Sequence, residues 1–114
     1  AFTPAPDWVG GFNVYGPPGA APAACRIEGL AAAVRAARRL GTDPEPYAAA
    51  IRRASAFVRR LQVSPEEAGL FPDPEKVRGG VRAGLDDWTM RIDYAQHALS
   101  GWLLAAEALE GLEE

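Results

Sequence analysis

The residues with the clearest chemical potential lie near the C-terminal end of the chain. Asp93 and His97 are four residues apart, so on a helix their side chains share one face and can meet. An aspartate that orients an imidazole suits it to general acid or base catalysis. Arg91, just before this pair, could bind an anionic or hydroxyl-rich group. The alternative is that Asp93 only caps the first helical turn and that His97 bonds locally.

A similar combination of an arginine and an acid occurs earlier in the chain, as Arg26 and Glu28. Glu28 is therefore a third acid/base candidate and Arg26 a second substrate-binding candidate. An acid in the first turn of a helix is also favoured by the helix dipole, which explains Glu28 equally well. Aromatic side chains in the predicted loops could stack on sugar rings, or could simply fill the rim of a cavity. These are Trp8, Phe12, Tyr15 and Trp88.

The chain has one cysteine, Cys25, and one histidine, His97. It therefore has no internal disulfide, and the counts argue against a zinc site built from cysteine and histidine. Cys25 precedes a predicted helix, where a thiolate can be stabilised, but a small buried cysteine is the commoner case. Neither glycine pair fits a nucleotide-binding loop. We expect no metal and no cofactor.

Helices must position these side chains, and the apolar periodicity predicts three of them, near residues 25–40, 45–61 and 91–110. A Pro- and Gly-rich loop is expected over residues 1–24 and a helical hairpin segment over residues 25–114. Between the second and third helices, Ser64 and Glu67 resemble a capping box. No segment alternates for long enough to predict a strand. The expected fold class is all-α, with antiparallel helical hairpins.

The last predicted helix is the most strongly patterned. Its main apolar face comprises Ile92, Ala95, Leu99, Trp102, Ala106 and Leu109. A polar stripe comprises Asp93, Gln96, His97 and Ser100, and beyond Ser100 this side becomes apolar. We therefore expect a helix buried on most sides, with a stripe near its N-terminal end that lines a cavity. Gln96 joins the substrate-binding candidates for this reason.

Composition sets further bounds. The 114 residues suffice for one small domain, and the 48% hydrophobic content argues against disorder. A net charge of −3 gives no overall attraction to nucleic acid. Arginines on the first two helices could form an anion-binding face, but they lack the interleaved aromatics typical of single-strand binding. No apolar run is long enough to span a membrane and no signal peptide is visible, so cytoplasmic location is the default expectation.

A short pattern recurs along the chain. A glycine loop at Gly10-Gly11 precedes a helix that opens with Arg26-Ile27-Glu28, and a second loop at Gly79-Gly80 precedes a helix that opens with Arg91-Ile92-Asp93. An amphipathic helix lies between them. This order predicts a structural repeat in which Arg26 and Arg91 are equivalent positions at one end of two parallel helices.

This arrangement, from Gly10 to Leu109, resembles the α/α-toroid superfamily of six-hairpin barrels. Inner helices alternate with outer ones in that superfamily, and loops at one rim build the active site. Its members include glycosidases, polysaccharide lyases, sugar epimerases and terpene cyclases. The resemblance implies a carbohydrate-processing cavity enzyme, with Asp93, His97 and Glu28 as catalytic candidates.

Complete toroids have many more helices than the three predicted here, so we expect a C-terminal fragment or processed piece of a longer protein. The apolar last helix should then pack on the rest of that chain or on further copies. The rival interpretation is a non-catalytic helical module that packs on a partner chain. The two differ in whether the polar stripe of the last helix faces an open cavity.

Overall fold

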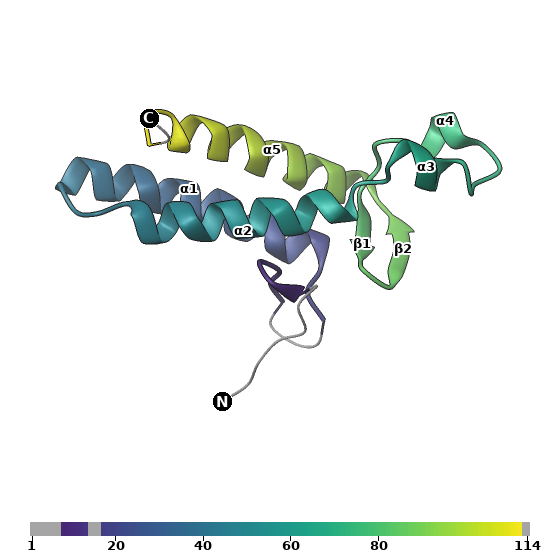
Figure 1. Ribbon diagram of the computed structural model, residues 1–114, viewed down its shortest axis with the longest axis horizontal. Helices are drawn as coiled ribbons and strands as arrows, with labels where there is room; N and C mark the ends of the chain where they lie inside the picture. The colour runs from purple at the N-terminus through teal and green to yellow at the C-terminus, as the bar shows by residue number, and fades with distance from the viewer. Residues whose placement is uncertain (1–7, 14–16, 113–114) are drawn as a thin grey trace.

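The computed structural model describes residues 8–13 and 17–112, which form three long helices, two short helices and a small β-hairpin (Figure 1). The long helices are α1 (Ala20–Leu40), α2 (Glu45–Leu61) and α5 (Ile92–Leu109), the short ones α3 (Pro65–Ala68) and α4 (Pro74–Val77), and the strands β1 (Arg82–Gly84) and β2 (Asp87–Met90). The prediction of a mainly helical chain with three long helices is confirmed.

α1 and α2 form an antiparallel hairpin. Gly41 ends α1 in the left-handed conformation, with φ of 71°, which glycine adopts without strain. The backbone N–H of Glu45 then donates to the carboxylate of Asp43 at 3.0 Å and helps to open α2. α1 begins at Ala20 rather than Cys25, so the predicted loop over residues 1–24 is too long. The alanine-rich stretch before Cys25 is helical because Ala20, Ala23 and Ala24 are buried in the core.

α5 runs parallel to α1 and lies beside it. His97 meets Cys25 near one end of this contact, and at the other end the Arg38 guanidinium donates to the carbonyl oxygen of Glu110 at 2.6 Å. Between these ends, Arg35 forms an ion pair of 2.9 Å with Glu107. Contacts that follow the same order along both helices establish the parallel arrangement.

The contact between α1 and α5 is made by small residues. The buried positions of α5 are Ala98, Gly101, Ala105 and Ala108. A Cβ atom on Gly101 would lie 3.2 Å from the carbonyl oxygen of Ala24 and 3.4 Å from the Cβ of Ile27. The two helices therefore approach so closely that a larger side chain at Gly101 would not fit without a shift of the backbone.

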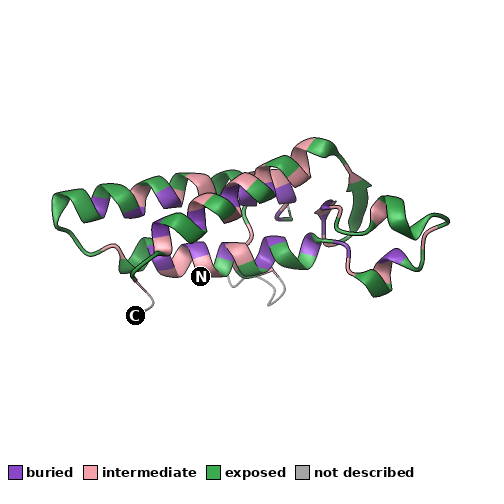
Figure 2. Cartoon of the chain, turned by 90° about the horizontal axis from the view of Figure 1, so that it is seen from above, coloured by how far each residue is buried: buried purple, intermediate pink, exposed green. Residues whose placement is uncertain are grey.

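The larger apolar residues of α5 point elsewhere, which corrects the predicted orientation of this helix. Ile92 is 88% exposed, Leu99 58% and Leu103 62%. Trp102 and Leu109 are half-buried, and the outer side of α5 stays largely exposed (Figure 2). α5 has two apolar faces. Periodicity alone predicted burial of the face with the larger side chains, but the face that packs on α1 is the one with the smaller side chains. Among the residues that the structure describes, α5 is therefore not buried on most sides.

The core lies mainly between α1 and α2. Its largest fully buried side chains are Phe57, Ile27, Ile51, Leu61, Val34 and Val58. α1 contacts both other long helices, whereas α2 and α5 contact each other only weakly. α1 is therefore the central helix, and a groove remains between the other two.

The β-hairpin corrects the prediction that residues 62–89 form no strand. β1 and β2 are antiparallel, with Arg82 opposite Met90 and Gly84 opposite Asp87. Isolated bridges connect Gly84 with Gly19 and Val81 with Gln62, so the hairpin links the start of α1 to the end of α2. Strands of three and four residues are too short to show an alternating pattern in the sequence.

The predicted capping box at Ser64 is confirmed, and it orients a charged side chain. The Ser64 hydroxyl accepts from the Glu67 N–H, and the Glu67 carboxylate accepts from the Ser64 N–H. Glu67 also forms an ion pair of 3.1 Å with the buried Arg82, whose guanidinium stacks 4.1 Å from the centre of the Trp88 ring. These hydrogen bonds from Ser64, followed by the charge of Arg82, lower the pKa of Glu67.

Residues 8–13 lie across the middle of α2. Gly10 has φ of 87°, and a Cβ atom there would overlap the backbone carbonyl of Arg53. A Cβ atom on Gly11 would overlap the side chain of Pro18 and would lie 2.9 Å from the ring of Phe57. Both glycines are therefore required for this segment to pack directly on the helix backbone.

The predicted repeat is only partly supported. The two helices that contain the matching triplets are parallel, as expected. Arg91, however, immediately precedes α5, while Arg26 lies well inside α1, because α1 begins at Ala20. The two arginines are therefore not equivalent positions.

Replacing Gly101 with leucine should lower the free energy of unfolding by about 1–3 kcal/mol, because the added side chain has no space between α1 and α5. Gly29 is the matched control, since a Cβ atom there meets nothing within 4 Å. Gly29→Ala should instead raise the free energy of unfolding by about 0.5–1 kcal/mol. Urea unfolding followed by circular dichroism measures both changes. Equal stability of Gly101→Leu and the unsubstituted chain would show that the helices are not closely packed.

Candidate functional site

One cluster of reactive side chains joins α1 to α5. Nδ1 of His97, on α5, lies 3.3 Å from Oε1 of Glu28 and 3.7 Å from Sγ of Cys25, both on α1. Cys25 and Glu28 are three residues apart, so they lie on the same side of α1. The structure thus brings together two of the three predicted catalytic residues, His97 and Glu28, and adds Cys25.

The geometry of this cluster does not match a nucleophile relay. In such a relay one ring nitrogen of the histidine faces the nucleophile and the other faces the carboxylate. Here Cys25 and Glu28 both approach Nδ1, which can donate to one or accept from the other but not do both at once. Desolvation, and then the charge of Glu28, raises the pKa of the Cys25 thiol, which keeps it protonated at neutral pH. The cluster is better suited to linking the two helices than to attacking a substrate.

The predicted pair of Asp93 and His97 does not form. The Asp93 carboxylate instead accepts from Nε of Arg91 at 2.9 Å. The backbone of Arg91 is extended, because this residue immediately precedes the first helical residue of α5. Its guanidinium lies over the ring of Tyr94, 5.4 Å from the ring centre. His97 turns toward α1, where Glu28 provides the carboxylate.

Arg91 and Asp93 line a hollow of about 560 Å³ between the start of α1, the β-hairpin and α5. Its walls include the aromatic rings of Trp8 and Tyr94 and the carboxylates of Asp86 and Asp87. The pKa of Asp87 is lowered, because its carboxylate accepts from the backbone N–H of Thr89. The hollow therefore combines carboxylate oxygen acceptors with aromatic faces.

The remaining predicted binding residues are dispersed. Arg26 is exposed and stacks 4.9 Å from the centre of the Phe12 ring. Gln96 is exposed on α5. Trp88 contacts Arg82 and Phe71 rather than His97. Tyr15 lies outside the described residues. Over residues 8–13 and 17–112, no group of three or more His, Cys, Asp or Glu side chains could hold a metal ion.

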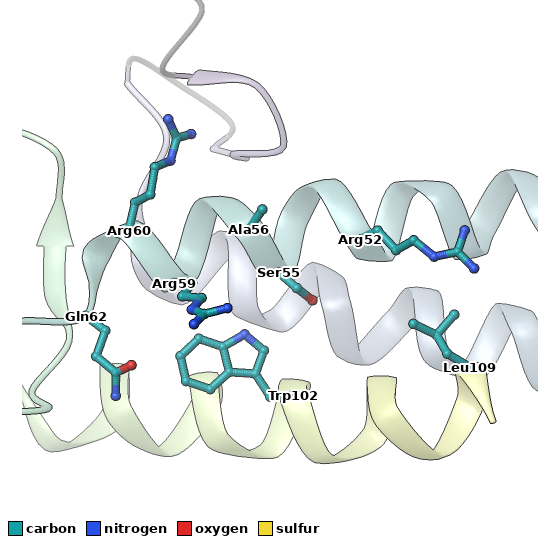
Figure 3. A pocket seen from close by; sticks show the side chains of 8 residues that line it. All are labelled: Arg52, Ser55, Ala56, Arg59, Arg60, Gln62, Trp102 and Leu109. Carbon is teal, nitrogen blue, oxygen red and sulfur yellow. The ribbon is translucent and has the colours of Figure 1, made fainter. Parts of the chain in front are cut away.

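The sequence did not reveal a groove of about 750 Å³ between α2 and α5 (Figure 3). Its apolar lining is formed by Trp102 and Leu109 of α5 and by Ala56 of α2. Its polar lining comprises Arg52, Ser55, Arg59, Arg60 and Gln62, all from α2 or its end. The arginine pairs of α2 and Trp102 are visible in the sequence. That they line the same groove is not, because this depends on α1 holding α2 and α5 apart.

The arginines of the groove differ in their pairing. Arg52 forms an ion pair of 2.8 Å with Glu45. Arg60 stacks 5.6 Å from the centre of the Phe57 ring. Arg59 extends toward the indole of Trp102 (Figure 3), and no carboxylate in the described part of the chain pairs with it. Its charge is available for a bound anionic group.

No protein-family model, curated protein or solved structure matches this chain. Of the helices that the structure describes, none has the length and apolar character needed to cross a bilayer.

Glu28→Gln should make Cys25 more reactive, because removing the negative charge lowers the thiol pKa and raises the thiolate fraction. We expect alkylation by iodoacetamide near pH 8 to become about two- to fivefold faster. Desolvation is the larger cause and remains, so the midpoint of the rate–pH profile should stay above that of a free thiol. Glu45→Gln, on α2, is the control and should leave the rate unchanged. An unchanged profile in Glu28→Gln would show that the carboxylate does not act on the thiol.

Proposed function

We propose that the chain is a non-catalytic helical module that binds an acidic amphipathic helix of a partner chain in the groove between α2 and α5. The observation that carries the proposal is that one groove combines apolar and basic side chains. Its apolar floor comprises Trp102, Leu109 and Ala56, and its basic rim comprises Arg52, Arg59 and Arg60. Grooves of this kind receive helices that place apolar side chains on the floor and charged ones along the edge.

The floor supports an apolar anchor. Trp102 and Leu109 are half-buried, and each keeps an apolar surface turned toward the groove (Figure 3). Burial of one aliphatic side chain against such a surface stabilises a complex by roughly 1.5–3 kcal/mol before ordering costs. Trp and Arg are also the side chains that most often dominate the energy of an interface.

The basic rim favours acidic side chains on the partner helix. Arg52, Arg59 and Arg60 line the groove from α2. Arg52 is paired with Glu45 and Arg60 stacks on Phe57, so Arg59 is the arginine whose charge the described carboxylates leave available. At 1.5 Å per residue, the stretch from Arg52 to Gln62 is about 15 Å long, which accommodates two to three turns of a second helix. The chain as a whole has a net charge of −3, so the basic character is local to this edge.

Synthetic peptides test this proposal. The probe is a capped 14-residue helix with leucines along one face and glutamates flanking them, and its counterpart replaces each glutamate with lysine. The glutamate peptide should bind, and Arg59→Glu should weaken its binding about tenfold or more. Raising the salt concentration should also weaken it, because the rim is exposed. Isothermal titration calorimetry measures these affinities.

Arg39→Glu provides the matched control, because Arg39 is an exposed arginine on α1, outside the groove. It should bind the glutamate peptide as tightly as the unsubstituted chain. Equal affinity for the lysine peptide, or preferential binding of a single-stranded oligonucleotide, would contradict the proposal.

A second candidate follows from the toroid-like arrangement. α1 and α5 are parallel and adjacent, while α2 runs antiparallel on α1, as inner and outer helices do in an α/α-toroid. In this proposal the chain is part of such a carbohydrate-processing barrel, and its sugar ligand lies in the hollow of Arg91 and Asp93. What supports it is the presence of Trp8, Tyr94 and three aspartates around that hollow. Aromatic faces and carboxylate acceptors are the groups that bind sugar rings and hydroxyls.

Titration with neutral oligosaccharides tests the second candidate. Tyr94 and Trp8 resonances should shift in nuclear magnetic resonance spectra, and Asp93→Asn should reduce the affinity about tenfold. Glu66→Gln, in α3 and outside the hollow, is the control. Spectra that do not change at millimolar oligosaccharide would remove the support for a sugar site in this chain.

A further inference from the structure

A small pocket lies where residues 8–13 meet both α1 and α2. We name it the arginine pocket, and it is lined by Gly10, Gly11, Arg26, Ala50, Arg53 and Ala54. Its volume is about 140 Å³, against about 750 Å³ for the groove between α2 and α5. It shares no lining residue with that groove or with the hollow of Arg91 and Asp93, so it is a separate site.

The two arginines of the pocket come from different helices, and residues 8–13 contact both of them. Arg26 belongs to α1, and its guanidinium stacks 4.9 Å from the centre of the Phe12 ring. Arg53 belongs to α2, and its backbone carbonyl is the group against which Gly10 packs. The stacking on Phe12 restricts the guanidinium of Arg26 before any ligand binds, which lowers the entropic cost of binding.

The positive charge of the pocket has no internal counterion. No carboxylate in residues 8–13 and 17–112 pairs with Arg26 or Arg53, and no acid lines the pocket. Glu28, the acid nearest to Arg26 in the sequence, lies 3.3 Å from His97 instead. Two guanidinium groups beside one pocket repel each other, and an anion between them would offset that repulsion.

The rest of the lining sets the size of the group that fits. Gly10 and Gly11 contribute only backbone, and Ala50 and Ala54 contribute only methyl groups. A pocket of about 140 Å³ admits one compact group and leaves the remainder of a ligand in solvent. The pocket is therefore far too small for a helix, and its charge selects a small anion.

We propose that the arginine pocket binds a phosphate group, held between the guanidinium groups of Arg26 and Arg53. A phosphate monoester carries a charge of about −1.5 to −2 at neutral pH and offers three acceptor oxygens, which matches two arginines. The planar fork of each guanidinium can donate to two phosphate oxygens at once. A carboxylate carries a single negative charge and would leave one arginine without a counterion.

Titration with inorganic phosphate, followed by amide nuclear magnetic resonance spectra of the full chain at low salt, tests the proposal. The amide resonances of Gly10 and Gly11 should shift and reach saturation. Arg53→Gln should weaken binding about fivefold or more, because a charged hydrogen-bond donor is lost. Acetate should bind more weakly than phosphate. Circular dichroism verifies that the variant stays helical, as expected for an exposed position that accepts glutamine.

Two matched controls separate this pocket from general attraction to arginine. Arg39→Gln removes an exposed arginine of α1 outside the pocket, and Arg59→Gln removes the unpaired arginine of the groove. Both should bind phosphate as tightly as the unsubstituted chain, so the pocket does not depend on the proposed helix-binding function. Shifts that never saturate, or an equal loss of affinity in Arg39→Gln and Arg53→Gln, would overturn the proposal.

A second titration, with ethyl phosphate, distinguishes the two sources of the phosphate group. Tighter binding of ethyl phosphate than of inorganic phosphate would support an ester as the ligand, since part of an ester can contact the alanines or Phe12 at the edge of the pocket. Tighter binding of inorganic phosphate would support the free ion. If neither compound shifts the resonances of Gly10 and Gly11, the pocket does not bind phosphate and the proposal is overturned.

Discussion

The close contact of α1 with α5 determines the arrangement of the rest of the molecule. Gly101 and the alanines around it bring α5 close to the backbone of α1 near Ala24 and Ile27. Small side chains release little hydrophobic free energy when they are buried, but they allow many atoms of two helices to approach within van der Waals distance. Because α1 packs against α5 on one side and against α2 on the other, α2 and α5 contact each other only weakly.

The groove follows from this contact. Because α5 packs its small residues against α1, its larger residues face either the groove or solvent. Trp102 faces the arginines of α2, whereas Leu99 and Leu103 face solvent. The polar cluster of Cys25, Glu28 and His97 also follows, since the parallel alignment of the helices brings these residues together from distant parts of the sequence.

The sequence predicted the elements better than it predicted their contacts. Helix ends could be predicted because their signals are local, as with Gly41 and the capping box at Ser64. The hairpin at Arg82 could not, since its strands are too short for a period and depend on bridges to distant residues. The structure brings Glu28 and His97 together. From the sequence, Asp93 was instead assigned to His97, because periodicity shows which residues share a face and not which neighbouring helix supplies the partner.

The position of Gly10 has a consequence for how this chain tolerates change. Any other residue there would place its Cβ atom on the backbone carbonyl of Arg53, and φ of 87° would add strain. The segment over residues 8–13 would have to leave α2, and with it the cover that Gly11 provides over the ring of Phe57. Solvent would then reach the largest side chain of the core, although the substituted residue itself lies in a loop. Mutational tolerance in this loop is therefore governed by the backbone of α2 rather than by the exposure of the loop.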